Sequence, residues 1–521
     1  MRLFTLLIGL AVCVAFRSTA QQSGNGYDPY QLYSVEQLRQ DFAVLRKTLE
    51  DRHPSIYRYS SREEMNRYFD DVYCQLHRPM TETAFGDLLR PLIVQIRCGH
   101  TDLQESLSYR RWRSKPKPEW LPFDIILANN RLYIGRNRST DSTLVPGTEV
   151  VKLGSHPVSE VVTFAKNRWP SDGYNETFKD YFLELYFLEE VYWKHFDGQS
   201  PWTVTVRDTT GCERITTIQR KPRITGSELN PVPFNANVPT EKPDKLTRAI
   251  RKIRKVSPGP QKLDQDEVKQ QLMRSLQFPA SDSSVAILII NGFSYEKHES
   301  FHRDVFRTLK QAHTRSLIID LRQNMGGNAE IGADLMAYLI DSTFRQVDRA
   351  ECRVRKPNAW AYFDRKEKRL LRQNFRYLGK GNGRYLFGKS NVGWMEPADE
   401  YKFKGNVYVL TSGRTFSAAS IFAASLKAQR PVKVIGQETG GGEAGCNGGI
   451  IQTLTLPNTR LRVRFPIFWI ATASQQPDQG RGVMPDIPVT YAVWDRIRQR
   501  DLEVERALKL AMEDQGATVR K

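Results

Sequence analysis

The stretch Val407-Tyr-Val-Leu-Thr-Ser-Gly-Arg-Thr-Phe-Ser-Ala-Ala-Ser-Ile-Phe-Ala-Ala-Ser-Leu-Lys427 predicts a buried strand that turns directly into a buried helix. Val407–Thr411 is apolar and β-prone, and the alanine-rich run from Ser417 to Lys427 has high helix propensity. Ser417 therefore stands where a helix begins, and the unpaired N–H groups there favour negative charge. A hydroxyl at such a point can attack a carbonyl carbon while N–H groups bind the oxyanion. The alternative is that Ser417 only caps the helix.

The sequence on both sides of this stretch alternates strands with helices. The expected strands are Val285–Ile290, Ser316–Asp320 and Val432–Ile435, and the expected helices are Phe301–Ala312 and Glu330–Leu339. The first strand is a continuous apolar run, which is typical of a strand covered on both faces. The alternation predicts an α/β core with a mostly parallel sheet.

The segment Asp320-Leu-Arg-Gln-Asn-Met-Gly-Gly-Asn328 follows one of these strands. In an open α/β sheet, ligands bind at the carboxyl ends of the strands. The adjacent glycines let backbone N–H groups approach a ligand without a Cβ in the way. We therefore expect the N–H of Gly327 to act as an oxyanion donor beside the N–H of Ala418. The alternative is a turn that needs glycine for its own backbone.

A second glycine-rich segment is Gly440-Gly-Gly-Glu-Ala-Gly-Cys-Asn-Gly-Gly449. It lacks the Gly-Lys-Ser/Thr ending of a P-loop, so it predicts a flexible loop near the site and not a phosphate cradle. We expect Gly440 and Gly441, together with Gly326, to contact the substrate.

The chain before residue 284 shows a different organisation. Helical periodicity begins at the capping-box spacing of Ser34 and Gln37 and continues to Ile96. Short strands and turns follow from Trp120, and a proline-rich stretch follows them. The expected organisation is a signal peptide over 1–20, a helical domain over 27–103, a β-rich module over 120–223, a linker over 224–265 and a catalytic domain over 266–521.

The N-terminus has the pattern of a secretory signal peptide. Arg2 precedes an apolar run, and small residues precede Gln21. The run is too short to span a bilayer comfortably, and the bulky Val12 argues against a lipid anchor at Cys13. We expect an exported protein, periplasmic or extracellular and soluble after removal of the signal peptide.

Charge and cysteine content restrict the partners. The net charge of +19 is concentrated in basic runs near 110–117, 245–255 and 365–384. We interpret these runs as solvated linkers and faces. Peripheral contact with an anionic envelope surface is the alternative, and export argues against nucleic acid. The six cysteines are scattered, and no CxxC or HExxH spacing occurs, so we expect neither a structural metal nor a cofactor.

Four motifs occur in the order found in the tail-specific (C-terminal processing) protease family, which the chain resembles from about residue 284 to 490. They are Asp320-Leu-Arg-Gln-Asn-Met-Gly-Gly, Thr415-Phe-Ser-Ala-Ala-Ser-Ile-Phe, Ile435-Gly-Gln-Glu-Thr-Gly-Gly and Gly482-Val-Met-Pro-Asp. The resemblance implies a crotonase-like (ClpP/crotonase) α/β core, with a PDZ-like domain over 120–223. It also implies that Ser417 is the nucleophile and that Gly327 and Ala418 line the oxyanion hole.

The sequence departs from the Ser/Lys members of this family, because the Gly440–Gly449 loop contains no lysine. The tricorn-like branch uses a histidine placed before the PDZ-like domain, where His100 stands in a polar turn. A lone histidine is more often structural, but the resemblance implies that His100 is the general base.

The acid that orients His100 is left open by the resemblance. Gly99 and Gln479 replace the serine and the acid of the tricorn-like pattern. We expect Asp478 to take this role, with Glu438 and Glu443 as alternatives.

The expected function is that of an exported serine endopeptidase. Its partners are protein or peptide substrates captured by strand addition, with recognition of their C-terminus as an open alternative. The alternative is a catalytically inactive relative that binds peptides or hydrophobic ligands, because a fold alone does not prove chemistry.

Overall fold

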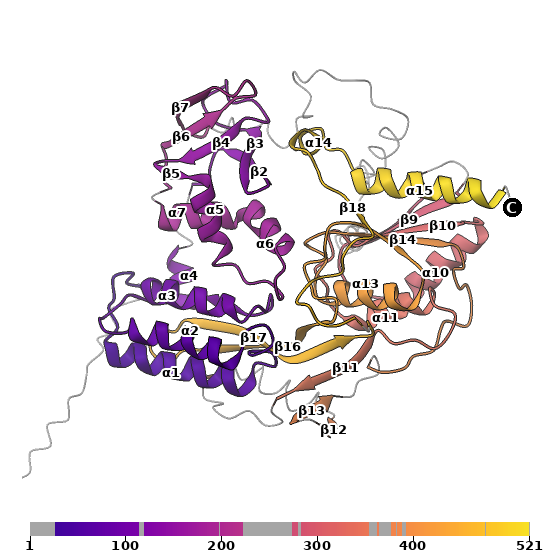
Figure 1. Cartoon of the computed structure of the whole chain (residues 1–521), viewed down its shortest axis with the longest axis horizontal. Helices are drawn as coiled ribbons and strands as arrows, with labels where there is room; N and C mark the ends of the chain where they lie inside the picture. Colours follow the sequence, from indigo (N-terminus) through magenta and orange to yellow (C-terminus); the bar gives the residue numbers. More distant parts are fainter. Residues whose placement is uncertain are drawn as a thin grey trace, which may run out of the picture.

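The computed structural model describes residues 27–113, 119–196, 198–221, 273–279, 283–353, 362–363, 377–381, 383–387, 392–474 and 476–519. It contains three six-stranded sheets, each with its own set of helices (Figure 1). The predicted signal peptide and the predicted linker over 224–265 lie outside these residues. Within them, no helix combines the length and apolar character needed to cross a bilayer.

The first sheet has the order β18-β15-β14-β10-β9-β8. All neighbouring pairs are parallel except β8 with β9. Its strands are β8 (Arg274–Gln277), β9 (Val285–Ile290), β10 (Ser316–Asp320), β14 (Asn406–Thr411), β15 (Lys433–Gly436) and β18 (Ile487–Pro488). The predicted strands therefore occur where the apolar runs placed them, and this part of the chain is a mixed α/β fold.

Helices cover both faces of this sheet (Figure 1). They are α10 (His298–Gln311), α11 (Ala329–Ala337), α13 (Ala418–Gln429) and α15 (Leu502–Val519). Alternate strand residues such as Leu288, Ile319 and Val409 point into the core beneath the first three helices. The residues between them, such as Ile287 and Ile318, pack against α15. Burial on both faces explains the continuous apolar runs.

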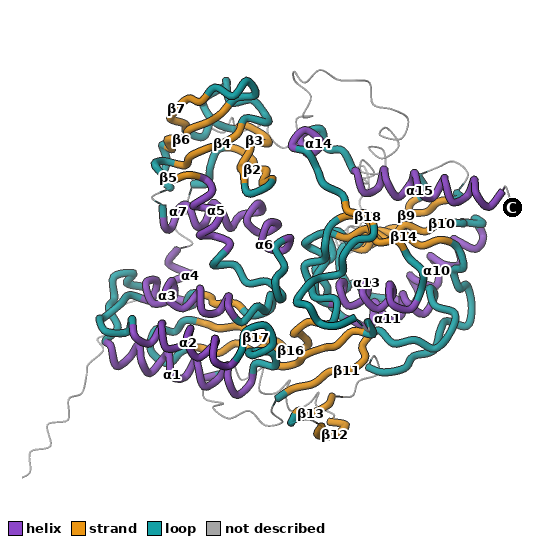
Figure 2. The backbone as a smooth tube through the Cα atoms, in the orientation of Figure 1, coloured by secondary structure: helices purple, strands orange, loops and turns teal. Residues whose placement is uncertain are grey.

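The second sheet is antiparallel, with the order β1-β17-β11-β13-β12 and with β16 paired to β17. Its strands are β1 (Asp102–Gln104), β11 (Val347–Cys352), β12 (Tyr377–Gly381), β13 (Arg384–Phe387), β16 (Gly445–Thr455) and β17 (Arg462–Thr472). The long β16–β17 pair reaches from the catalytic core to the N-terminal helices (Figure 2). Three strands of this sheet, β11, β12 and β13, come from the part of the chain between β10 and β14.

The N-terminal helices use this second sheet to complete their core. They are α1 (Val35–Arg52), α2 (Arg62–Cys74), α3 (Glu82–Gln95) and the short α4 (Leu107–Arg113). Leu45 and Phe69 of the helices share one cluster with Val463 and Phe465 of β17. The predicted capping box at Ser34 and Gln37 is present. The helical segment therefore folds against residues some 400 positions later.

The third sheet, β2-β3-β4-β6-β7 with β5 beside β4, is antiparallel. We call residues 120–221 the β-rich module. Its strands are β2 (Phe123–Ala128), β3 (Arg131–Asn137), β4 (Glu149–Leu153), β5 (His156–Pro157), β6 (Trp202–Arg207) and β7 (Glu213–Ile218). Its helical segments are α5 (Val158–Lys166), α6 (Thr177–Phe182), η1 (Leu183–Phe187) and α7 (Leu188–His195). The helical run over 177–195 was not predicted.

One local prediction is wrong. The Gly440–Gly449 segment was expected to be a flexible loop, but strand β16 begins at Gly445 and pairs with β17 from there. Gly445 has φ +151°, and a Cβ there would lie 2.3 Å from the carbonyl oxygen of Ile470. The glycines in this part of the segment permit close strand packing, which a count of glycines does not distinguish from flexibility. The five cysteines in the described residues, Cys74, Cys98, Cys212, Cys352 and Cys446, are free thiols.

Candidate active site

Ser417 lies on a sharp turn between β14 and α13. Its backbone has φ +55° and ψ −126°, and its side chain makes no capping hydrogen bond to the helix. A non-glycine residue in this region costs on the order of 1–3 kcal/mol, so neighbouring contacts must hold it. The N–H of Phe416 donates to the carbonyl of Asn324 (3.1 Å), and Thr415 Oγ1 donates to the carbonyl of Leu321 (2.9 Å). The hydroxyl is thus held away from the helix, and the alternative role as a helix cap is not seen.

His100 meets Ser417 from a part of the chain 317 residues away. Its Nε2 lies 3.1 Å from Ser417 Oγ. Its ring stacks on Phe416, with ring centroids 4.4 Å apart. Burial, and to a smaller extent the charge of Arg464, lower the pKa of His100 to about 4. The imidazole is therefore neutral near pH 7, and its Nε2 can accept the serine proton.

The loop that follows β10 packs closely against Ser417. Gly326 packs so closely that a Cβ there would lie 2.7 Å from Ser417 Cβ and 2.8 Å from the nitrogen of Ala418. Among the described residues, neither the N–H of Gly327 nor that of Ala418 donates to an acceptor. Ala418 follows the nucleophile in the chain, and Gly327 follows Gly326, which packs against it.

The second glycine-rich segment closes over the same turn. A Cβ on Gly441 would lie 2.1 Å from Ser420 Oγ and 3.0 Å from the nitrogen of Ser417. A Cβ on Gly440 would lie 2.1 Å from the carbonyl oxygen of Gly413. Gly441 therefore borders the nucleophile, and Gly440 borders the turn before it, so a side chain at either position would displace the turn.

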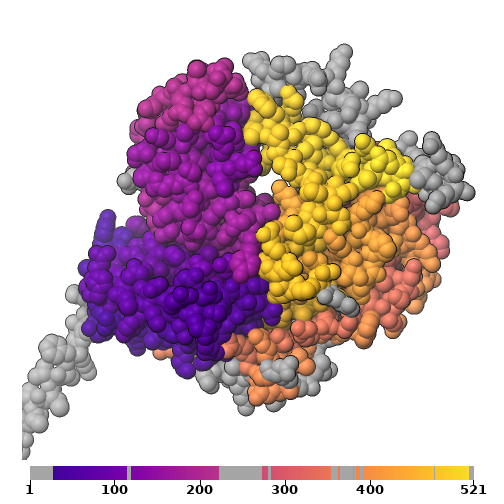
Figure 3. Space-filling view, in the orientation of Figure 1, coloured from indigo at the N-terminus to yellow at the C-terminus, as the bar shows by residue number. Residues whose placement is uncertain are grey.

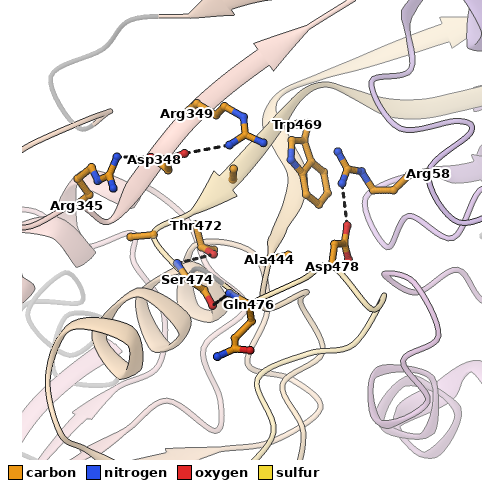
Figure 4. A pocket seen from close by; sticks show the side chains of 12 residues that line it. Arg58, Arg345, Asp348, Arg349, Ala444, Trp469, Thr472, Ser474, Gln476 and Asp478 are labelled. Carbon is orange, nitrogen blue, oxygen red and sulfur yellow. Dashed lines mark hydrogen bonds and ion pairs between the residues drawn. The ribbon is translucent and has the colours of Figure 1, made fainter. Parts of the chain in front are cut away.

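The predicted acid, Asp478, is not joined to His100. Its carboxylate accepts hydrogen bonds from Arg58 (2.8 Å) and from the hydroxyl of Tyr59 (3.1 Å). Figure 4 shows this ion pair between Asp478 and Arg58 in the lining of a pocket that Trp469 also lines. The carboxylate of Glu438 instead accepts from Arg481 (3.0 Å) and from the N–H of Gly482 (2.8 Å). No described contact joins His100 to Glu443 either, and Nδ1 of His100 is buried without a partner among the described residues.

Two residues of the β-rich module stand beside the site, and sequence reasoning missed both. Asp172 accepts a hydrogen bond from the N–H of Gly99, the residue before His100 (2.8 Å). The ring of Phe178 stacks on Phe416, with centroids 4.5 Å apart. Neither residue belongs to a recognisable motif. The one signal was the polar turn Ser171-Asp-Gly-Tyr-Asn175.

The groups gathered at Ser417 suit proton transfer and acyl transfer. The described residues contain no group of three or more His, Cys, Asp or Glu side chains that could hold a metal ion. A serine hydroxyl and a neutral imidazole within hydrogen-bond distance of it are components of nucleophilic acyl transfer.

Comparison with known proteins agrees with this chemistry. Residues 284–489 match the model of peptidase family S41. Curated proteins give no match. Mature CPAF superposes with a TM-score of 0.56 at 13% identity, over 92% of this chain and 96% of that one. Mature CPAF complexed with lactacystin gives 0.57 at 14% identity, over 92% and 98%. At such identity the likeness shows a shared fold.

Family assignment and site geometry point to one enzyme class. The family match covers Ser417 and the glycines around it, while His100 lies outside the matched residues. Residues 284–489 thus form a peptidase family S41 domain, and the chain is a serine peptidase.

Proposed function

We propose that this protein is a serine endopeptidase of the C-terminal processing type in which His100, and not a lysine, is the general base. The observation that carries the proposal is the 3.1 Å approach of His100 Nε2 to Ser417 Oγ, beside two unengaged N–H groups. This choice of base belongs to the tricorn-like branch of the family.

The reaction follows from these positions. His100 takes the proton of Ser417 as Oγ attacks the peptide carbonyl, and the N–H groups of Gly327 and Ala418 bind the oxyanion. The imidazolium then gives its proton to the departing amine, which leaves an acyl-serine. Water attacks this ester with His100 again as base, so the free acid and the free Ser417 hydroxyl are restored.

The test is covalent labelling with a fluorophosphonate probe. Wild-type protein should label at Ser417, and Ser417→Ala and His100→Ala should each abolish labelling. Labelling that survives in His100→Ala would show that another group activates the serine. A wild-type protein that never labels would favour the binding-only alternative.

We further propose that the β-rich module is a PDZ-like domain, that the catalytic domain has a crotonase-like core, and that peptide substrates reach Ser417 through the cleft between them. This cleft has a volume of about 1070 Å³ and opens between the module and the C-terminal segment (Figure 3). Its walls include Ile125 of β2, the end strand of its sheet, and Ser412 and Gly413, which precede the nucleophile.

An extended peptide can pair with the outer edge of β2. The backbone of Leu127 there is now held by side chains, because its carbonyl accepts from Arg496 (3.3 Å) and its N–H donates to Glu184 (3.4 Å). A peptide strand would replace these two contacts with main-chain hydrogen bonds. If the C-terminus is recognised, a peptide ending in a free carboxylate should slow labelling more than the same peptide with a C-terminal amide. Equal slowing would refute C-terminal recognition.

Export is proposed from the N-terminal sequence alone. Sequencing of the mature protein should find Gln21 as its first residue, and an intact Met1 would refute export with cleavage. Contact with an anionic envelope surface would appear as salt-sensitive binding to anionic vesicles.

A further inference from the structure

Residues 171–178 of the β-rich module, which we call the bridging segment, contact the turn of His100, the turn of Ser417 and the segment before Gly440. The N–H of Gly173 donates to the carbonyl of Arg97 (2.9 Å), in the turn that carries His100. The N–H of Tyr174 donates to the carbonyl of Gly480 (2.7 Å). Asn175 Nδ2 donates to the carbonyl of Thr439 (2.9 Å), beside the glycines that cover Ser417. The module is thus joined to the site by specific polar contacts.

Asp172 is the acidic residue of this segment that contacts the turn of His100. Its side chain is 5% exposed, and its Oδ1 accepts from the N–H of Gly99 (2.8 Å). Its Oδ2 is buried without a partner among the described residues, as is Nδ1 of His100. Position 99 has no room for a side chain, because a Cβ there would lie 2.9 Å from the ring of Phe416. The carboxylate therefore fixes the peptide from which His100 projects.

A stack of three rings fixes the plane of the imidazole. Phe178 of the bridging segment, Phe416 beside the nucleophile and His100 stack with successive centroid separations of 4.5 and 4.4 Å. Phe178 and Phe416 are 3% and 4% exposed. The backbone of His100 is thus set through Asp172 and its ring through Phe178, both from the same module.

We propose that Asp172 is the positioning residue for His100. The bridging segment then supplies the orienting carboxylate that the family resemblance had led us to expect at Asp478. The proposal rests on His100 acting as the base of Ser417. It makes the β-rich module a structural component of the catalytic site, in addition to any role in binding peptides.

The ionisation of Asp172 adds a second effect. Burial raises its pKa to about 7, the N–H groups of Gly99 and Gly442 oppose this rise, and the charge of Asp478 adds to it. The other titratable groups that face this carboxylate are Tyr59, Cys98 and Cys446, whose own pKa values are raised by burial and by Asp172. Above pH 7 the carboxylate is charged, which favours the imidazolium that forms when His100 takes the serine proton. Below pH 7 this stabilisation is lost.

The experiment measures fluorophosphonate labelling as a function of probe concentration, which separates the maximal rate constant from the half-saturating concentration. The variants are Asp172→Ala, Asp172→Asn and, as a matched control in the same segment, Glu176→Gln. The Glu176 carboxylate only meets surface lysines, Lys166 (3.3 Å) and Lys179 (3.0 Å). Asparagine retains the oxygen that accepts from Gly99 but cannot ionise.

Asp172→Ala should lower the maximal rate constant by roughly 10- to 100-fold, the effect of a lost charge-assisted hydrogen bond. The half-saturating concentration should stay within about twofold. Asp172→Asn should recover part of the rate and lose the rise near pH 7, so that only the step near the His100 pKa of about 4 remains.

A maximal rate constant in Asp172→Ala equal to that of Glu176→Gln would overturn the proposal. If Asp172→Ala does not fold, Asp172→Asn decides, because a pH profile identical to that of wild type excludes the role. Both outcomes leave the proposed function standing as long as wild-type protein labels at Ser417 and Ser417→Ala does not.

Discussion

Replacing Gly441 by alanine tests how tightly the glycine-rich segment holds the nucleophile. The new Cβ would lie 2.1 Å from Ser420 Oγ, 2.9 Å from Ser420 Cβ and 3.0 Å from the nitrogen of Ser417. Ordinary carbon–carbon contact begins near 3.5 Å, so the segment and the start of α13 must separate by about 0.6 Å even if Ser420 Oγ rotates away. That rotation also breaks the hydrogen bond from Ser420 Oγ to the carbonyl of Ser417 (2.8 Å).

The expected cost follows from these contacts. Overpacking of this kind costs about 1–3 kcal/mol, and the lost hydrogen bond about 1 kcal/mol. Because a misplacement of about 1 Å at a reacting group costs on the order of 100-fold in rate, a shift of this size should slow labelling of Ser417 by about 10- to 100-fold. The unfolding midpoint should fall by several degrees.

The assay is fluorophosphonate labelling with thermal unfolding on the same samples. Gly448→Ala is the matched control, since its Cβ would meet nothing closer than 3.4 Å. Ser420→Gly removes two of the three close contacts, so Gly441→Ala should cost less in that background than in wild type. Wild-type labelling and an unchanged midpoint in Gly441→Ala would refute the packing argument.

Three further changes probe other parts of the molecule. The unfolding free energy of Ser417→Gly, measured with urea, should exceed that of Ser417→Ala by about 1 kcal/mol. The reason is that glycine adopts φ +55° without strain. Equal stability of the two variants would contradict strain at this residue. Arg322→Met should destabilise by about 3–5 kcal/mol in the same assay, because the buried Asp501 and Glu503 and the half-buried Asp320 lose their shared cation. A neutral effect would show that the network is dispensable. Burial lowers the pKa of His53 to about 3. Between pH 6.5 and about 3, the unfolded state therefore binds a proton that the folded state does not bind. The unfolding free energy should therefore fall by about 1.4 kcal/mol per pH unit below 6.5 from this group, and His53→Asn should reduce the slope; an unchanged slope would exclude His53 as its source.

The sequence predicted most of the catalytic domain because its signals are local. Continuous apolar runs located β9, β10 and β14, and small residues after β14 located the turn at Ser417. His100 was identified only through the family resemblance, since its polar turn has no chemical signature of its own. The contact that brings it to Ser417 depends on the β1–β17 pairing, which no local pattern encodes.

Asp172 and Asp478 show what could not be predicted about the site from the sequence. Both are aspartates in polar turns, and nothing in their neighbours along the chain distinguishes them. Asp478 is joined to Arg58, whereas Asp172 is buried against the His100 turn. Which of two similar carboxylates serves the base depends on how three separate sheets pack together, and single-sequence reasoning has no access to that packing.

The shared core of the N-terminal helices and strand β17 has a consequence for biosynthesis. Leu45 and Phe69 leave the ribosome long before Val463 and Phe465, their apolar partners, have been made. The same long interval separates His100 from Ser417, and β17 is the strand that holds β1 just after the histidine. A growing chain therefore has no assembled catalytic pair until almost all of it has been translated. For that reason an unfinished chain cannot cleave itself, and it needs no separate inhibitor at this stage.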